Sequence, residues 1–270
     1  IKAGLLYAGT DKGQFWMTRD GGTTWMEQTG LPAAYIRCIE PSRFRESRVY
    51  AVLSGLNYDD FGTHVYKSDD YGKSWEKITA NLPSETAYVI KEDPRHEHVL
   101  FAGLYRAIYI STDRGKTWSQ FGTGMPATAI SDIEFDDLSR DLVVSTHGRG
   151  IYNLNLRGLD EWLAKGMPRQ DQVFSLPKTV APNPDKLPDD SNSIVYEKLP
   201  ITFWQTEPGE VTISVSNDSS KVVWTARMTA RRGFNQYRWD LVTQRNTSPL
   251  PYFLKFREYL SVAQEDEGDA

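Results

Sequence analysis

The stretch SDDYGKSW, at Ser68–Trp75, recurs in this chain as TRDGGTTW at Thr18–Trp25 and as STDRGKTW at Ser111–Trp118. All three copies have an aspartate at the third position, a glycine at the fifth and a tryptophan at the eighth, with hydroxyl residues at the first and seventh. The copies start 50 and 43 residues apart. So many residue types at fixed offsets indicate an internal structural repeat.

Each octapeptide has the chemistry of a tight hairpin. Its aspartate can accept hydrogen bonds from loop amides, its glycine supplies a positive φ, and its tryptophan starts the next strand with a large apolar anchor. The residues concerned are Asp20, Gly22, Trp25, Asp70, Gly72, Trp75, Asp113, Gly115 and Trp118. Because turn chemistry accounts for each residue type, we expect a structural role here rather than catalysis or metal binding.

Strand patterns surround the octapeptides. An apolar pattern precedes each copy, and a second one leads directly into it. The first kind covers residues 5–10, 49–54, 99–104 and 142–146, and the second covers 14–18, 63–68 and 107–111. The fourth unit keeps its strand pair but has no octapeptide. Strands repeated at this period are typical of the four-stranded blades of a β-propeller, so the sequence predicts an all-β fold.

The pattern changes after the fourth unit. We expect propeller blades over residues 1–166, ending in a short helix at 159–166, and a Pro-rich linker or crossing segment over 167–200. Alternating strands then predict a small β-sandwich over 201–260, followed by an acidic, disordered tail at 261–270. Its predicted core contains Ile213, Val215, Val223, Trp224 and Trp239.

Composition excludes several classes of protein. The net charge of −5 argues against nucleic acid as the main partner, and no run of about 18 apolar residues could cross a membrane. Cys38 is the only cysteine, so there is no internal disulfide framework. Nothing in the patterns calls for a cofactor or a metal ion.

The octapeptide resembles the Asp box of BNR-repeat propellers, a group that includes sialidases, sortilin-like receptors and several glycoside hydrolases. The chain is most similar to bacterial sortilin-like propellers, often labelled BNR-repeat glycosyl hydrolases, over roughly residues 5–242. The resemblance rests on NYDDFGTHVYKSDDYGKSW, VIKEDP, VLFAGLYRAIYISTDRGKTW and LVVSTHGRGIY. In the carboxyl-terminal part, an Ig-like sandwich is implied by matches at Gly233, Asn235, Trp239, Asp240 and Leu241.

The resemblance also implies a setting. Proteins of this kind are secreted, periplasmic or on the bacterial cell surface, and their propellers have more blades than the four units seen here. We therefore expect missing blades, or a companion chain, to cover the apolar surface around Leu5, Tyr7 and Trp16.

Two loops are candidate ligand sites. His147 and Arg149 lie in a glycine-flanked turn between apolar strands, and Arg149 could hold a carboxylate with a bidentate fork. Asp59 and Asp60 lie in the long loop of the second unit. Each has a structural alternative: the glycines of the first turn can simply form a hairpin, and the aspartates can form a solvated loop tip.

Other polar groups leave alternatives open. A glycosidase needs two facing carboxylates, and beyond the second-unit loop the candidates are Asp132, Glu134, Asp136 and Asp137. His96 and His98 could contribute to a metal site or belong to an inter-blade turn. Arginines in the sandwich could dock an acidic partner or form a solvated face; they are Arg227, Arg231, Arg232 and Arg238.

Two functions therefore compete. One is a non-catalytic binding or scaffold protein outside the cytoplasm that recognises protein, peptide or glycan. The other is a glycoside hydrolase whose active site lies partly on blades absent from this chain. A site lined by aromatic residues and arginines would favour the binding protein, and a convergent carboxylate pair would favour the enzyme.

Overall fold

The computed structural model describes residues 3–122, 124–167, 169–176, 199–217 and 219–239, together with the strand residues 242–243, 246–249 and 262–263. The chain divides into two compact units, Ile1–Leu156 (unit 1) and Arg157–Ala270 (unit 2). Antiparallel strands dominate the described part of both units, which confirms the predicted all-β fold class. Among the described residues, no helix is long and apolar enough to cross a membrane.

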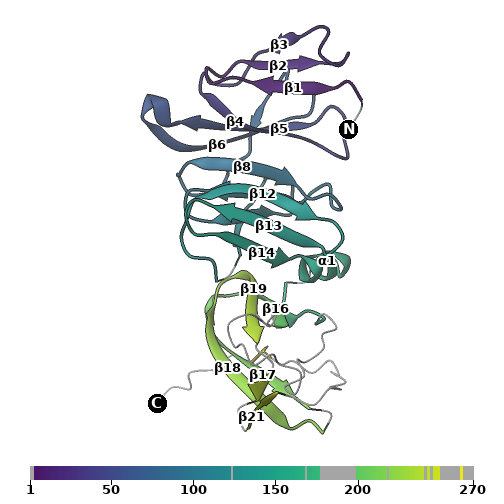
Figure 1. Cartoon of the computed structure of the whole chain (residues 1–270), viewed down its shortest axis with the longest axis vertical. Coiled ribbons are helices and arrows are strands. Elements are labelled where there is room, and N and C mark those ends of the chain that lie inside the picture. The colour runs from purple at the N-terminus through teal and green to yellow at the C-terminus, as the bar shows by residue number, and fades with distance from the viewer. Residues whose placement is uncertain are drawn as a thin grey trace, which may run out of the picture. The chain divides into compact units, whose positions relative to one another are not determined.

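Unit 1 consists of four antiparallel sheets in chain order (Figure 1). Sheet 1 contains β1 (Leu6–Gly9), β2 (Phe15–Thr18) and β3 (Met26–Gln28). Sheet 2 contains β4 (Tyr35–Pro41), β5 (Val49–Gly55), β6 (Asp60–Ser68) and β7 (Glu76–Lys77), with a 3-10 turn at Leu56–Tyr58. Sheet 3 contains β8 (Ala87–Glu92), β9 (Leu100–Leu104), β10 (Ile108–Ser111) and β11 (Ser119–Phe121). Sheet 4 contains β12 (Ile130–Asp136), β13 (Asp141–Thr146) and β14 (Ile151–Asn155).

Sheets 2 and 3 have the four-stranded up-and-down topology of a propeller blade. Successive sheets contact each other, β1 with β4, β5 with β8 and β8 with β12. Residues of β5 and β9 are buried along their whole length, because each strand is covered on both faces by neighbouring sheets. This explains why both strands read as continuous apolar runs rather than as alternating patterns.

The octapeptide tryptophans anchor each sheet on the sheet before it. Trp118 is 4% exposed, and its Nε1–H donates to the carbonyl oxygen of Ile78 in the preceding sheet at 2.8 Å. Trp75 packs edge-on against Phe15 of sheet 1, with ring centroids 5.0 Å apart. Trp25, in sheet 1, remains 41% exposed.

Buried carboxylates fasten the turns between the first and second strands. Glu92 accepts hydrogen bonds from the Ser42 hydroxyl at 2.7 Å and the Tyr50 hydroxyl at 3.0 Å, both in sheet 2. The next residue, Asp93, pairs with Arg140 of sheet 4 at 2.6 Å. Glu92 and Asp93, which are adjacent in sheet 3, therefore join this sheet to sheet 2 and to sheet 4 respectively.

The outer face of sheet 1 is only partly covered. Leu6 is 46% exposed and Trp16 is half-buried, whereas Leu5 is buried and Tyr7 packs against Phe15 in the apolar cluster between sheets 1 and 2. That a further blade or a companion chain covers this face stays a prediction.

Unit 2 begins with the helix α1 (Arg157–Ala164). From the sequence we expect this helix at the end of the first domain. Gly158 lets the helix pack closely against Phe174, since a Cβ at this position would lie only 2.9 Å from the Phe174 ring. Trp162 stacks on Trp204 with ring centroids 4.4 Å apart, so the helix is held by aromatic packing.

The strands of unit 2 form two small sheets and a short hairpin. One sheet pairs β15 (Gln172–Val173), β16 (Leu199–Gln205) and β19 (Gly233–Trp239), and the other pairs β18 (Val222–Ala230), β17 (Gly209–Ser216) and β22 (Val262–Ala263). The hairpin is β20 (Val242–Thr243) with β21 (Asn246–Pro249). One apolar cluster joins β16 to β17, and it includes the predicted core residues Ile213, Val215, Val223, Trp224 and Trp239.

Parts of the predicted domain plan lie outside the described residues. These are most of the Pro-rich segment, the family-matching residues Asp240 and Leu241, and most of the acidic tail. Within that tail, Val262 and Ala263 pair with β17. The domain limits remain a prediction.

Candidate ligand-binding surface

The hairpins β5–β6, β9–β10 and β13–β14, between the second and third strands of sheets 2 to 4, lie at one end of unit 1, together with the β1–β2 hairpin of sheet 1. In an up-and-down sheet, this hairpin is at the end where the first strand begins, opposite the turns on either side of it. Hydrogen bonds between neighbouring sheets follow this arrangement: the Thr10 carbonyl accepts from the Ile36 N–H at 3.1 Å, and the Arg106 carbonyl accepts from the Thr128 N–H at 3.2 Å. We call this the hairpin end of unit 1.

The octapeptide loops lie at the opposite ends of the strands. Their aspartates each accept hydrogen bonds from the N–H and the hydroxyl of the seventh residue, which is Thr24, Ser74 or Thr117. The N–H bonds measure 2.8–2.9 Å and the hydroxyl bonds 2.6 Å. The glycines have φ values of 86° to 98°, as this turn requires. The carboxylates are therefore engaged in holding their own loops.

Replacing Asp113 with alanine is expected to lower the free energy of unfolding by about 1–2 kcal/mol, because the N–H of Thr117 loses its acceptor. Burial opposes ionisation of Asp113, but the hydrogen bonds from Thr117 outweigh it and lower the pKa of the carboxyl. The stabilisation should therefore be present above pH 4 or so and be lost as the pH falls through the lowered pKa. Urea denaturation at pH 7 and pH 3 measures both effects; equal stability of the two proteins at pH 7 would contradict the expectation.

His147 and Arg149 lie at the tip of the β13–β14 hairpin, and both are exposed. The hairpin is closed by the Thr146 hydroxyl, which donates to the Gly150 carbonyl at 2.6 Å. Thr128 then ties this tip to sheet 3: its N–H donates to the Arg106 carbonyl at 3.2 Å and its hydroxyl to the His147 carbonyl at 3.4 Å. The β9–β10 and β13–β14 hairpins are thus neighbours at the hairpin end.

Asp59 and Asp60 lie on the β5–β6 hairpin, also at the hairpin end. Asp59 adopts a left-handed conformation with φ 58°. Asp60 accepts a hydrogen bond from the Gly62 N–H at 2.8 Å and lies 2.7 Å from His64 Nε2. The Gly62 N–H holds the pKa of Asp60 below its usual value. Asp60 is therefore unsuited to act as a proton donor near neutral pH.

The four carboxylates of the fourth unit are occupied in different ways. Asp132 accepts from the Ile133 N–H, and Glu134 pairs with Lys91 at 2.8 Å. Asp136 accepts from the Leu138 N–H, which lowers the pKa of its carboxyl, and Asp137 pairs with Arg43 at 3.6 Å. Asp136 is the last residue of β12, and Asp137 begins the turn to β13.

His96 belongs to the turn between β8 and β9. Its Nδ1 lies 3.2 Å from Asp93 and 3.3 Å from Arg140, within the contact that joins sheets 3 and 4. Burial lowers the pKa of His98. In the described part of the chain, no three His, Cys, Asp or Glu side chains are grouped to hold a metal ion.

The sandwich arginines are spread over one strand of each sheet and the turn between them. All four are exposed: Arg227 on β18, Arg231 and Arg232 in the turn, and Arg238 on β19.

A β-bulge recurs in the first strand of sheets 2, 3 and 4. The extra residue is Arg37 in β4, Tyr88 in β8 and Ser131 in β12. A bulge takes a residue out of the pairing register and re-aims its side chain, and it is frequent next to functional sites. Three equivalent bulges therefore place three different side chains in equivalent positions of successive sheets.

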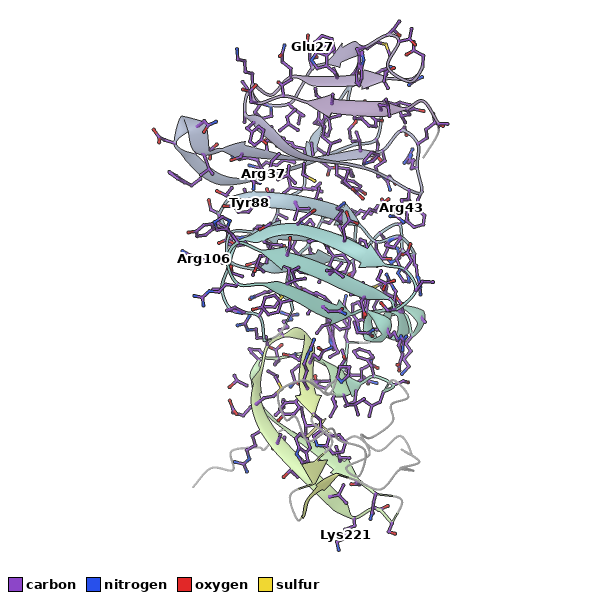
Figure 2. All side chains as sticks on the ribbon, in the orientation of Figure 1. Glu27, Arg37, Arg43, Tyr88, Arg106 and Lys221 are labelled. Atoms are coloured by element: carbon purple, nitrogen blue, oxygen red, sulfur yellow. The ribbon has the colours of Figure 1, made fainter. Side chains whose placement is uncertain are left out.

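Arginine and tyrosine side chains gather around these bulges. The Arg37 guanidinium lies 4.3 Å from the ring centroid of Tyr88, in a cation–π contact (Figure 2). Burial raises the pKa of Tyr88, and Arg37, Tyr105 and Glu85 are close enough to act on it electrostatically. Tyr105 is 53% exposed and precedes Arg106, whose side chain is 74% exposed. We call Arg37, Tyr88, Tyr105 and Arg106 the arginine–tyrosine surface.

Glu85 lies under this surface. It is 3.8 Å from the Arg106 guanidinium, and its Oε1 is buried without a hydrogen-bond partner. Burial raises the pKa of its carboxyl above the usual range. One mostly buried carboxylate therefore offsets only part of the positive charge that the two exposed arginines present.

A second polar row crosses the first strands. Lys91 of β8 lies 2.8 Å from Glu134 of β12 and 3.7 Å from Glu40 of β4. Burial raises the pKa of Glu40 to about 7, although Lys91 acts to lower it. This row places two carboxylates on either side of one lysine.

The arginine–tyrosine surface was missed by sequence reasoning. Its residues come from β4, β8 and the β9–β10 hairpin, and none belongs to the octapeptides. Aligning the repeats on their first strands would have placed Arg37, Tyr88 and Ser131 at one position. The bulge that exposes them has no signature in the residue types themselves.

Comparisons with known proteins agree with propeller blades over part of the chain. The family model described as "Sortilin, neurotensin receptor 3" (Sortilin-Vps10) matches residues 63–158, less than half of the chain. No curated protein matches it.

Similar solved structures include the GH74 xyloglucanase from Xanthomonas campestris, with 16% identity, a TM-score of 0.46 and coverage of 58% of this chain and 26% of the other. YCF48 bound to D1 peptide has 15% identity, a TM-score of 0.39 and coverage of 83% and 66%. The GH74 enzyme of Niastella koreensis has 16% identity, a TM-score of 0.45 and coverage of 88% and 36%. This chain thus spans less than two thirds of each of these proteins, and similarity at this level carries no argument about activity. The segment similar to the sortilin family runs from β6 to the first turn of α1.

Proposed function

We propose that this chain is a non-catalytic binding protein that recognises a protein, peptide or glycan through the arginine–tyrosine surface. The observation that carries the proposal is the gathering of two arginines and two tyrosines from neighbouring sheets at the hairpin end of unit 1. Arginine and tyrosine are the residue types most enriched, with tryptophan, among residues that dominate binding energy.

The packing of this surface supports a binding role. Stacking on Tyr88 holds the Arg37 guanidinium in place, so less conformational entropy is lost when a ligand pairs with it. The bulge frees Arg37 from the alternation of β4, so its identity is not dictated by the core.

Two of the candidate catalytic carboxylates support the same conclusion. A glycosidase needs a protonated acid facing a second carboxylate. Asp60 has a lowered pKa and is bound to its own loop, and Asp136 serves a turn. Neither offers that arrangement.

The family resemblance supports the wider setting of the proposal. We place the protein outside the cytoplasm, on a bacterial cell surface, in the periplasm or secreted, as part of a larger polypeptide or assembly. In the same proposal the strands β16 to β19 of unit 2 form an Ig-like sandwich that follows the Pro-rich segment in the chain.

Arrays of immobilised peptides and glycans, probed with the labelled chain, test this function. We expect bound spots that are lost when Arg37 and Arg106 are both replaced by alanine, because the surface loses its exposed cations. The matched control is Arg19→Ala, which removes an arginine stacked 4.0 Å above Tyr71 at the octapeptide end. Spots that survive the double replacement would contradict the proposal.

A glycoside hydrolase remains the second candidate, because Glu40 and Glu134 both reach Lys91 and Glu40 has a pKa near neutrality. Its active site would lie partly on blades absent from this chain. Incubation with xyloglucan oligosaccharides decides between the two functions. Product release by this chain that disappears in Glu40→Gln would establish the enzyme.

A further inference from the structure

We propose that the ligand of the arginine–tyrosine surface is an acidic peptide in an extended conformation, whose carboxylates pair with arginines from successive sheets. This inference rests on the proposed function and narrows its ligand to one chemical class. Three exposed arginines take part: Arg37 from sheet 2, Arg106 from sheet 3 and Arg149 from sheet 4.

The three arginines form one continuous stretch of surface. Arg37 stacks on Tyr88, which lies within electrostatic reach of Tyr105 and Glu85. Glu85 is in turn 3.8 Å from Arg106. Thr128 donates hydrogen bonds to the carbonyl oxygens of both Arg106 and His147, so the hairpin tip that carries Arg149 lies next to the hairpin that carries Arg106.

These cations are available to a ligand. No described carboxylate forms an ion pair with Arg149 or with the neighbouring His147. The contact between Arg106 and Glu85, at 3.8 Å, is longer than a hydrogen bond and leaves most of the guanidinium exposed. A guanidinium in this condition can offer two N–H donors to a carboxylate.

The spacing of the sheets suits an extended peptide. Sheets that pack face to face lie about 10 Å apart. Arg106 and Arg149 are on equivalent hairpins of successive sheets, so we expect roughly this distance between them. In a polyproline II peptide every third side chain lies on the same face, about 9 Å further along. An extended peptide with an acidic residue at every third position therefore matches the surface.

The side chains around Tyr88 and the basic tip suit a peptide better than an acidic glycan. The face of Tyr88 that a sugar ring would cover is occupied by the Arg37 guanidinium. Beside the basic tip, Ile151 is 73% exposed, which offers an apolar contact to a peptide side chain. Acidic and apolar groups in alternation are common in peptides and absent from most glycans.

Fluorescence anisotropy of the full chain with a labelled peptide of four Glu-Pro-Leu repeats tests the proposal. The matched probe has glutamine in place of every glutamate. We expect the glutamate probe to bind at least about tenfold more tightly, with affinity that falls as salt rises, because the contacts are charge-assisted. Equal affinity for the two probes would overturn the acidic-peptide inference and leave the proposed binding function standing.

Variants locate the binding. Arg106→Gln and Arg149→Gln should each weaken binding of the glutamate probe by about three- to tenfold. Arg19→Gln, which removes the stacked arginine at the octapeptide end, should leave affinity unchanged. Binding that is unaffected by both hairpin-end variants would overturn the inference, as would failure of the glutamate probe to bind; the array experiment judges the proposed function separately.

Discussion

Replacing Arg140 with alanine is expected to lower the free energy of unfolding of unit 1 by about 3–5 kcal/mol. Its guanidinium lies 2.6 Å from the Asp93 carboxylate, and the two side chains are only 3% and 0% exposed. Removing one partner leaves a buried charge that water cannot solvate, which costs far more than the pair itself contributes. Urea denaturation followed by tryptophan fluorescence measures the loss.

The control for this experiment is Arg43→Ala. Arg43 also pairs with an aspartate of sheet 4, Asp137, at 3.6 Å, but the two side chains are about half exposed. Exposed pairs contribute less than about 1 kcal/mol, so this variant should remain near wild-type stability. Similar losses in the two variants would show that burial of the Arg140–Asp93 pair is not what holds sheets 3 and 4 together.

Replacing Trp118 with alanine is expected to cost a similar amount, about 3–5 kcal/mol. The side chain fills the space between sheets 2 and 3, and its Nε1–H bonds to Ile78. Alanine would leave a cavity and a buried carbonyl without this donor. Thermal unfolding followed by circular dichroism measures the change without relying on the lost fluorophore.

Trp25→Ala is the matched control, because Trp25 occupies the same position of the octapeptide in sheet 1. It is 41% exposed where Trp118 is 4% exposed, so the described residues leave a much larger part of its surface uncovered. We expect a much smaller loss from this replacement. A loss as large as that of Trp118→Ala would mean that the octapeptide tryptophan acts within its own loop rather than between sheets.

The fold could be predicted from sequence because local chemistry determines it. The octapeptides place an acceptor, a glycine and an anchor at fixed offsets, and the structure forms β2, β6 and β10 directly before them. The apolar runs that became β5 and β9 were equally clear, since burial on both faces requires apolar residues throughout.

The candidate site could be predicted only in part. His147, Arg149, Asp59 and Asp60 lie at the hairpin end. They could be selected from the sequence because glycine-rich and long loops are easy to recognise there. Their binding roles remain predictions. What the sequence could not show is which hairpin neighbours which, since contacts such as that of Thr128 with His147 depend on how sheets stack.

The arginine–tyrosine surface was invisible for a further reason. Arg37 and Tyr88 are far apart in sequence, and each reads as an ordinary strand residue. Only the bulge changes their direction, and the bulge arises from the pairing of β4 with β5 and of β8 with β9.

The three bulges also make the surface adjustable. Because Arg37, Tyr88 and Ser131 stand outside the pairing register, each can be exchanged without shifting the strand that carries it. The same backbone can therefore carry a different set of three side chains, one from each sheet, and so bind a different ligand. A library randomised at these three positions would vary recognition while leaving the apolar clusters between the sheets intact.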